Sequence, residues 1–113
     1  MNRKKAIQLL EAYYDDGFFF KDLSRRVAFQ TESQDPDKIL NLHEYLTKEI
    51  KPTLSEMGFD CKIYQNPDIK FKGPFLFGNR FESNNLPTVL IYGHGDVVKG
   101  EDNNWRKGLN PWK

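Results

Sequence analysis

The sequence is poor in several features that would each indicate a class of protein. It has one cysteine, Cys61, which excludes an intramolecular disulfide and a zinc site built from several cysteines. It has no apolar run of the ~20 residues that a membrane-spanning helix needs, and its polar, charged start is not that of a secretory signal. We therefore expect a cytoplasmic protein without a membrane partner. A net charge of +1 gives no electrostatic reason to expect nucleic acid.

What is present is typical of a folded chain. The 113 residues suffice for one small domain with one core, and the 38% of hydrophobic and 29% of charged residues do not favour disorder. Nine Phe, five Tyr and two Trp need partners to pack against. This favours either a well-packed core or a large interface.

Helical periodicity covers the first half of the chain. Residues 4–14 form a broad apolar stripe that ends at Asp15-Asp16-Gly17, and residues 18–28 form a second, shorter helix. The polar stretch 31–34 is expected to be a loop.

The clearest predicted helix begins at Asp35, whose side chain can cap it, with Pro36 in the first turn. Its apolar stripe continues to Gly58, a suitable residue for a C-terminal cap. Pro52 removes one internal hydrogen bond, so we expect a kink near Lys48 or two separate helices.

The pattern then changes from helical to strand periodicity. Alternation over 59–64 predicts a half-buried strand, with Cys61 as a small buried residue. Residues 66–74 are expected to turn, and 75–81 to form a second strand with a bulge or bend at Gly78-Asn79.

A third strand is predicted at Thr88–Tyr92. This run is almost continuously apolar, which is typical of a strand covered on both faces in the middle of an α/β sheet. Helices followed by strands predict an α/β fold in which N-terminal helices pack on a partial sheet. Ligands gather at the carboxyl ends of strands in open α/β sheets, and here that end carries His94 and Asp96. Residues 99–113 are expected to be a loop.

His94 and Asp96 form the one pair in the sequence that indicates chemistry. Side chains two residues apart in extended backbone start on the same face. An imidazole can bind zinc through one nitrogen and donate from the other to a carboxylate, which fixes its orientation. Gly93 and Gly95 leave room around the pair. His-x-Asp alone is a weak signal, and a histidine that pairs with a carboxylate and binds nothing fits it as well.

The stretch Thr88–Val98, TVLIYGHGDVV, resembles the first metal-ligand motif of a dizinc metallopeptidase family. That family includes aminoacylase, acetylornithine deacetylase, succinyl-diaminopimelate desuccinylase and bacterial glutamate carboxypeptidase. Trp105 and the later Pro111-Trp112 are similar to the family's next landmark, and Leu23–Ser33, LSRRVAFQTES, is similar to its first helix and loop. Two positions differ, since many members have Thr, Ser or Tyr where this chain has Gly95, and Pro where it has Lys99.

The resemblance implies that His94 is a terminal ligand to one of two Zn²⁺ ions, with Co²⁺ or Mn²⁺ as possible substitutes. It implies that Asp96 has a catalytic role by clamping the imidazole without touching the metal. The implied enzyme is a cytoplasmic hydrolase, an amidohydrolase or deacylase, that cleaves small peptides or N-acyl amino acids. At full length it could form a homodimer. The family's bridging aspartate, its paired glutamates and its distal histidine have no counterpart in this sequence.

Other acidic residues and the second histidine have plainer interpretations. His43 lies on the predicted long helix and is expected to be a surface or core residue, while Glu44 and Glu49 are expected on its solvated face. The favoured hypothesis is that residues 1–113 are the N-terminal portion of a metallopeptidase catalytic domain that is inactive alone.

Two alternatives stay open. One is a non-catalytic small domain that binds a protein partner through its aromatic surface. The other is a complete small metalloprotein that gains its missing ligands by homo-oligomerisation. If later strands are missing, the Thr88–Tyr92 strand becomes an exposed edge, and we expect the 113-residue protein to be poorly stable or self-associating.

Overall fold

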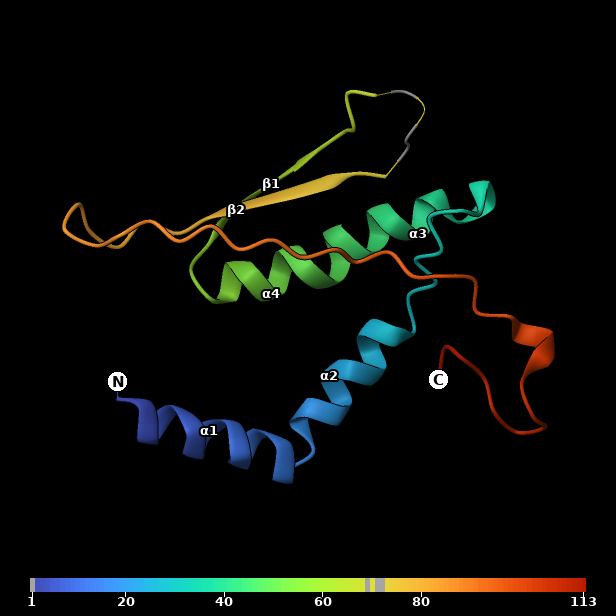
Figure 1. Cartoon of the computed structure of the whole chain (residues 1–113), viewed down its shortest axis with the longest axis horizontal. Helices are drawn as coiled ribbons and strands as arrows, with labels where there is room; N and C mark the ends of the chain where they lie inside the picture. The colour runs from blue at the N-terminus through green and yellow to red at the C-terminus, as the bar shows by residue number, and fades with distance from the viewer. Residues whose placement is uncertain (1, 69, 71–72) are drawn as a thin grey trace.

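The computed structural model describes residues 2–68, 70 and 73–113. Figure 1 shows a two-stranded sheet on one side of a long helical region, with two further helices on the other side. The expected mixed α/β content is confirmed, but the sheet is small and antiparallel. The peptidase-like domain expected around it stays a prediction.

The two N-terminal helices are close to their predicted positions. Helix α1 spans Arg3–Asp15 and α2 spans Phe18–Val27, joined at Gly17, whose φ of 76° is accessible to glycine at little cost. Asn2 caps α1 by accepting a hydrogen bond from the Lys5 amide at 2.9 Å. Neither helix has a buried residue, so their apolar stripes do not contribute to a core.

The predicted long helix is a continuous helical region with an irregular middle. It consists of η1 (Pro36–Lys38), α3 (Ile39–Glu44), the π-helical segment η2 (Tyr45–Ile50) and α4 (Lys51–Glu56). Asp35 caps its start, as predicted, by accepting a hydrogen bond from the Asp37 amide at 3.0 Å. The kink expected near Lys48 corresponds to the π-helical segment η2. This segment lies just before Pro52, which has no backbone N–H to donate to a helical hydrogen bond.

The C-terminal end of this region is also as predicted. Gly58 has a φ of 86°, and its amide donates to the Ser55 carbonyl at 2.9 Å while the Phe59 amide donates to the Leu54 carbonyl at 3.0 Å. This pair of hydrogen bonds is the Schellman motif, which turns the chain from α4 into the first strand.

The sheet pairs β1 (Asp60–Tyr64) with β2 (Phe75–Asn79), in the register Asp60↔Asn79 to Tyr64↔Phe75. Cys61 is buried on the face toward α4, as predicted. Of the bulge or bend predicted at Gly78-Asn79, the bulge is wrong, because both residues pair in regular register. The turn predicted over 66–74 lies partly outside the described residues, at positions 69, 71 and 72.

The third strand was predicted wrongly. Residues 88–92 are not in a strand, and the side chains of Val89, Leu90, Ile91 and Tyr92 are 74–88% exposed. In Figure 1 this segment, in orange, runs as an extended trace outside the sheet. A strand needs a neighbouring strand to pair its backbone N–H and C=O groups. Among the described residues, none makes backbone hydrogen bonds with this segment. Residues 99–113 are irregular except for the short η3 (Asp102–Asn104).

The molecule is more open than a chain of this size usually is. Its accessible surface is 9820 Å², whereas a folded monomer of 13.3 kDa exposes about 6,500 Å². Its radius of gyration is 17.1 Å, compared with about 13 Å for a compact chain of this length. Among the described residues, Leu42 and Cys61 are the buried hydrophobic residues. Most large apolar side chains of the described residues therefore remain exposed.

In the part of the chain that the structure describes, no helix combines the length and the apolar character needed to span a membrane.

Candidate functional site

The segment that carries His94 is held by the loop that follows α2. Glu32 and Val97 form an isolated parallel bridge, in which the Val97 amide donates to the Thr31 carbonyl at 3.0 Å. The Thr31 hydroxyl also donates to the Gly95 carbonyl at 2.6 Å, and Thr31 is only 3% exposed. These contacts join two loops more than sixty residues apart in sequence. The loop predicted at 31–34 is therefore a structural support for the site.

His94 and Asp96 are in contact. His94 Nδ1 lies 3.0 Å from Asp96 Oδ1, and the two side chains are 69% and 49% exposed. An ionised carboxylate can only accept, so Nδ1 is the donor in the neutral ring, and the lone pair is on Nε2. In this tautomer Nε2 is free to bind a metal ion while Nδ1 donates to the carboxylate. The metal role of His94 and the catalytic role of Asp96 nevertheless stay predictions.

Ser33 fixes the other oxygen of the carboxylate. The Ser33 hydroxyl donates to Asp96 Oδ2 at 2.8 Å. This hydrogen bond, and then that from His94, lowers the pKa of Asp96 against the opposing effect of partial burial. The carboxylate is thereby held ionised, with one oxygen on Ser33 and the other on the imidazole. This arrangement suits an orienting group better than a metal ligand.

The ring of Tyr45 limits the size of the residue at position 95, between His94 and Asp96. A Cβ added to Gly95 would lie 2.5 Å from Tyr45 Cε1 and 3.0 Å from Cδ1. The ring is in turn packed edge-on against Phe29, with centroids 5.5 Å apart. The presence of a glycine at position 95 is therefore explained by the aromatic ring of Tyr45 in η2.

A second clamp holds the chain just after the motif. Glu32 is 6% exposed, and its Oε1 accepts a hydrogen bond from the Gly100 amide at 2.8 Å, which lowers its pKa. Its Oε2 lies 3.0 Å from Lys38 Nζ, close enough for an ion pair but at an angle that does not make a hydrogen bond. Trp105 Nε1 donates to the Gly100 carbonyl at 2.7 Å. Hydrogen bonds therefore hold both the N–H and the carbonyl of Gly100.

The donor set fits part of a metal centre. A catalytic zinc site uses three protein ligands and an open position, and the structure offers the imidazole of His94. No group of three or more His, Cys, Asp or Glu residues with metal-binding geometry occurs among the described residues. His43, half-buried on α3, is not brought to His94 to form such a group.

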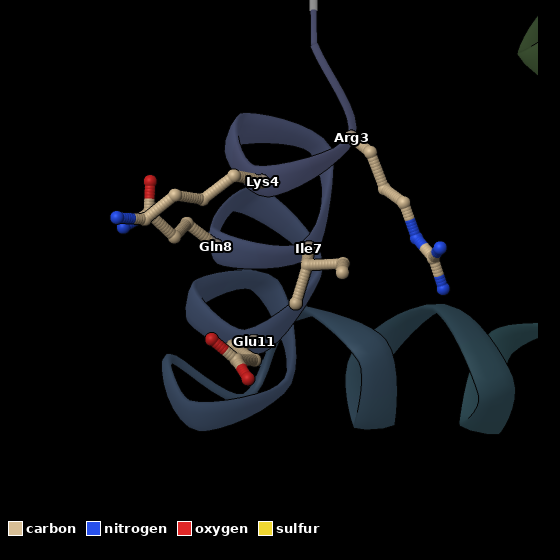
Figure 2. A pocket seen from close by; sticks show the side chains of 5 residues that line it. All are labelled: Arg3, Lys4, Ile7, Gln8 and Glu11. Atoms are coloured by element: carbon tan, nitrogen blue, oxygen red, sulfur yellow. The ribbon is translucent and has the colours of Figure 1, made fainter.

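An open hollow of ≈ 540 Å³ lies elsewhere, on α1, lined by Arg3, Lys4, Ile7, Gln8 and Glu11. Figure 2 shows that all five side chains belong to this one helix. The hollow is a feature of the helix surface, not a cleft between elements, and it includes no part of the His94 segment.

Comparisons with protein-family models, curated proteins and solved structures give no match. The residues around His94 and their geometry are therefore the basis for any functional inference. Sequence reasoning identified His94 and Asp96, but missed Ser33, Thr31 and Tyr45 as their supports. The polar stretch 31–34 contains the hydroxyl groups of Thr31 and Ser33, and this was a signal that could have directed attention to two of the three.

Proposed function

We propose that this chain provides His94 as a metal ligand, and Asp96 as its orienting carboxylate, to a dizinc hydrolase. The substrates would be small peptides or N-acyl amino acids, cleaved at an amide bond. The observation that carries the proposal is the 3.0 Å contact between His94 Nδ1 and Asp96 Oδ1 on a largely exposed ring. Carboxylate–imidazole pairs of this kind orient metal ligands in proteins.

The residues of this chain would act by positioning. The chemistry that two bound zinc ions would supply at this site is a lower pKa of the attacking water and a polarised amide carbonyl. His94 would present Nε2 in the neutral form, and Asp96 would keep the ring from rotating. Ser33 would hold the carboxylate, and Thr31 would hold the backbone at Gly95. Each of these contacts is a prearranged geometry, which is what a metal site requires of its supports.

A single protein ligand is too few for catalysis. We propose that the bridging aspartate, the glutamate pair and the distal histidine follow in polypeptide beyond residue 113, and that residues 1–113 alone are inactive. The complete enzyme would act in the cytoplasm as a homodimer. The nucleotide sequence after codon 113 tests this directly. An in-frame glycine-rich segment with an Asp, followed by a Glu-Glu pair, is expected, and a stop codon in its place would contradict the proposal.

Zinc content tests the role of His94 in whatever full-length product that frame encodes. Wild type is expected to hold two Zn²⁺ per chain, and His94→Ala to lose zinc and at least about 1,000-fold in activity, because one ligand and its clamp are removed. Asp96→Asn is expected to bind metal about 10–100-fold more weakly. His43→Ala is the matched control and should keep both ions. Equal zinc in His94→Ala and wild type would refute the proposal.

A second candidate is a non-catalytic domain that binds a protein partner through its aromatic surface. Phe20, Phe81 and Tyr92 are 70%, 72% and 86% exposed, which is unusual for residues that normally contribute to cores and interfaces. Near-zero zinc in every variant, together with capture of a partner that is lost on Phe81→Ser, would favour this candidate. Zinc in the 113-residue chain that disappears in His94→Ala would instead favour a metalloprotein completed by oligomerisation.

A further inference from the structure

The π-helical segment η2 is held at two places by α2 and the residues that follow it. Arg25 donates from Nε and Nη2 to the two carboxylate oxygens of Glu49, at 2.6 and 2.9 Å, and Arg26 Nε donates to Oε1 at 3.2 Å. Four residues earlier in η2, the ring of Tyr45 packs edge-on against Phe29, with ring centroids 5.5 Å apart. An ion cluster and an aromatic contact therefore fix the same side of η2.

The ring of Tyr45 also contacts the segment that carries His94. The position that a Cβ would take on Gly95 lies 2.5 Å from Tyr45 Cε1 and 3.0 Å from Cδ1, so the ring packs directly against this glycine. Burial raises the pKa of Tyr45, and the charges of Arg26 and Glu49 then lower and raise it, because the ring lies beside the ion cluster. A continuous set of contacts thus leads from Glu49, through the aromatic ring, to the neighbour of His94.

The ion cluster is well suited to fix the position of η2. Glu49 is 4% exposed, and a carboxylate bound by both prongs of a guanidinium has a defined direction as well as a favourable energy. Removing one partner of such a buried pair leaves the other without compensation. π-Helical turns are rare and frequently occur at functional sites, and this one contains both Tyr45 and Glu49. A purely structural role for Glu49 would stabilise the chain and leave the His94 segment in place.

We infer that Glu49 is a positioning residue for the metal ligand His94 and that it acts through the ring of Tyr45. The inference rests on the proposed function and gives η2, which contains no ligand itself, a part in it. The ring prevents Gly95 from moving toward η2, and the Thr31 hydroxyl holds the carbonyl of Gly95 at 2.6 Å. With the backbone held by both contacts, the imidazole next to it keeps one orientation, which a metal site requires of its ligands.

The NMR signal of Gly95 tests this coupling without metal. An aromatic ring shifts the signals of protons packed against it, so the Hα of Gly95 that points toward Tyr45 reports their contact. In the 113-residue chain in EDTA, Glu49→Gln is expected to move this signal toward its random-coil position. Glu44→Gln, which breaks an exposed ion pair, is the matched control and should leave the signal unchanged. Cys61→Ala, which loses buried packing in the sheet, should lower the urea midpoint without moving the signal.

Zinc affinity of the complete product tests whether the coupling reaches the ligand. Glu49→Gln is expected to weaken zinc binding, by less than the 10–100-fold expected when the carboxylate that contacts the imidazole is changed. Tyr45→Leu is also expected to weaken it. Because both changes act on one contact, the double variant should bind zinc no more weakly than Tyr45→Leu alone, and such non-additivity is the mark of residues that act as a unit. Glu44→Gln should bind zinc like wild type.

Arg25→Lys provides a milder second variant if Glu49→Gln does not fold. It keeps the charge but loses the two-pronged contact, and it should move the Gly95 signal in the same direction. An unmoved Gly95 signal in the folded variant, an equal shift in Cys61→Ala, or additive losses of zinc affinity would each overturn the inference. Near-zero zinc in the wild-type product would refute the proposed function instead. The Gly95 signal would still decide whether Glu49 acts on the His94 segment.

Discussion

The ring of Tyr45 lies against the Cα of Gly95, at a distance that leaves no space for a side chain. A Cβ at this position would lie 2.5 Å from Tyr45 Cε1, well inside van der Waals contact. Gly93, on the other side of His94, has nothing within 4 Å of its corresponding Cβ position. The two glycines that flank the histidine therefore differ. Gly95 is required by packing, whereas Gly93 is not constrained by any neighbour.

Gly95→Ala is expected to destabilise the site by about 1–3 kcal/mol, as overpacking does elsewhere, by pushing the His94 segment away from η2. The hydrogen bond from Thr31 to the Gly95 carbonyl would then be lost. Faster hydrogen exchange at the Val97 amide is the measurement. The matched control Gly93→Ala should change stability by less than about 0.5 kcal/mol. Adding Tyr45→Leu to Gly95→Ala is expected to restore slow exchange, and no rescue would contradict the steric explanation.

Local signals in the sequence predicted the helices and their ends. Asp35 and Gly58 are examples, because a capping side chain and a residue suited to positive φ act within one turn of their own positions. The His94–Asp96 contact was predictable for the same reason, since two positions of backbone determine it. The contact between Ser33 and Asp96 was not, because it joins positions 63 residues apart.

The two clearest errors also concern long-range relationships. Glu49 was predicted on a solvated face, but it is 4% exposed and bound by Arg25 and Arg26 of α2. The helical pattern cannot show that two guanidinium groups from another helix cover this position. Thr88–Tyr92 has the composition of a buried strand, but composition does not provide the neighbouring strand that would bury it.

Glu49→Gln is expected to lower the stability of the protein. Glu49 Oε2 accepts a hydrogen bond from Arg25 Nε at 2.6 Å, Oε1 accepts one from Arg25 Nη2 at 2.9 Å, and Arg26 Nε lies 3.2 Å from Oε1. The loss is expected to be about 1–2 kcal/mol, a value reduced for the partial exposure of the arginines. Urea unfolding at a fixed protein concentration measures it. Glu44→Gln, which removes an exposed pair with Lys48, should cost less than about 0.5 kcal/mol.

Stability is expected to fall below pH 5, and Glu49 is expected to contribute to the fall. Hydrogen bonds from Arg25, and then from Arg26, hold the pKa of Glu49 below its unfolded value of about 4.3. The unfolded chain therefore binds the proton first, so the stabilisation is complete above the unfolded pKa and is lost as pH falls through the folded one. Urea midpoints between pH 3 and 7 should change less in Glu49→Gln than in wild type. Parallel pH profiles would contradict this assignment.

Ser33→Ala is expected to raise the pKa of Asp96, because the Ser33 hydroxyl makes the hydrogen bond that lowers this pKa most. The titration of the Asp96 carboxyl carbon by NMR measures the change directly. Ser55→Ala, at an exposed serine on α4, is the control and should leave the titration unchanged. If Ser33→Ala has no effect, then the loop after α2 does not hold the carboxylate in solution. The imidazole of His94 would then lack the fixed partner that a metal ligand needs, and the case for a hydrolase would weaken with it.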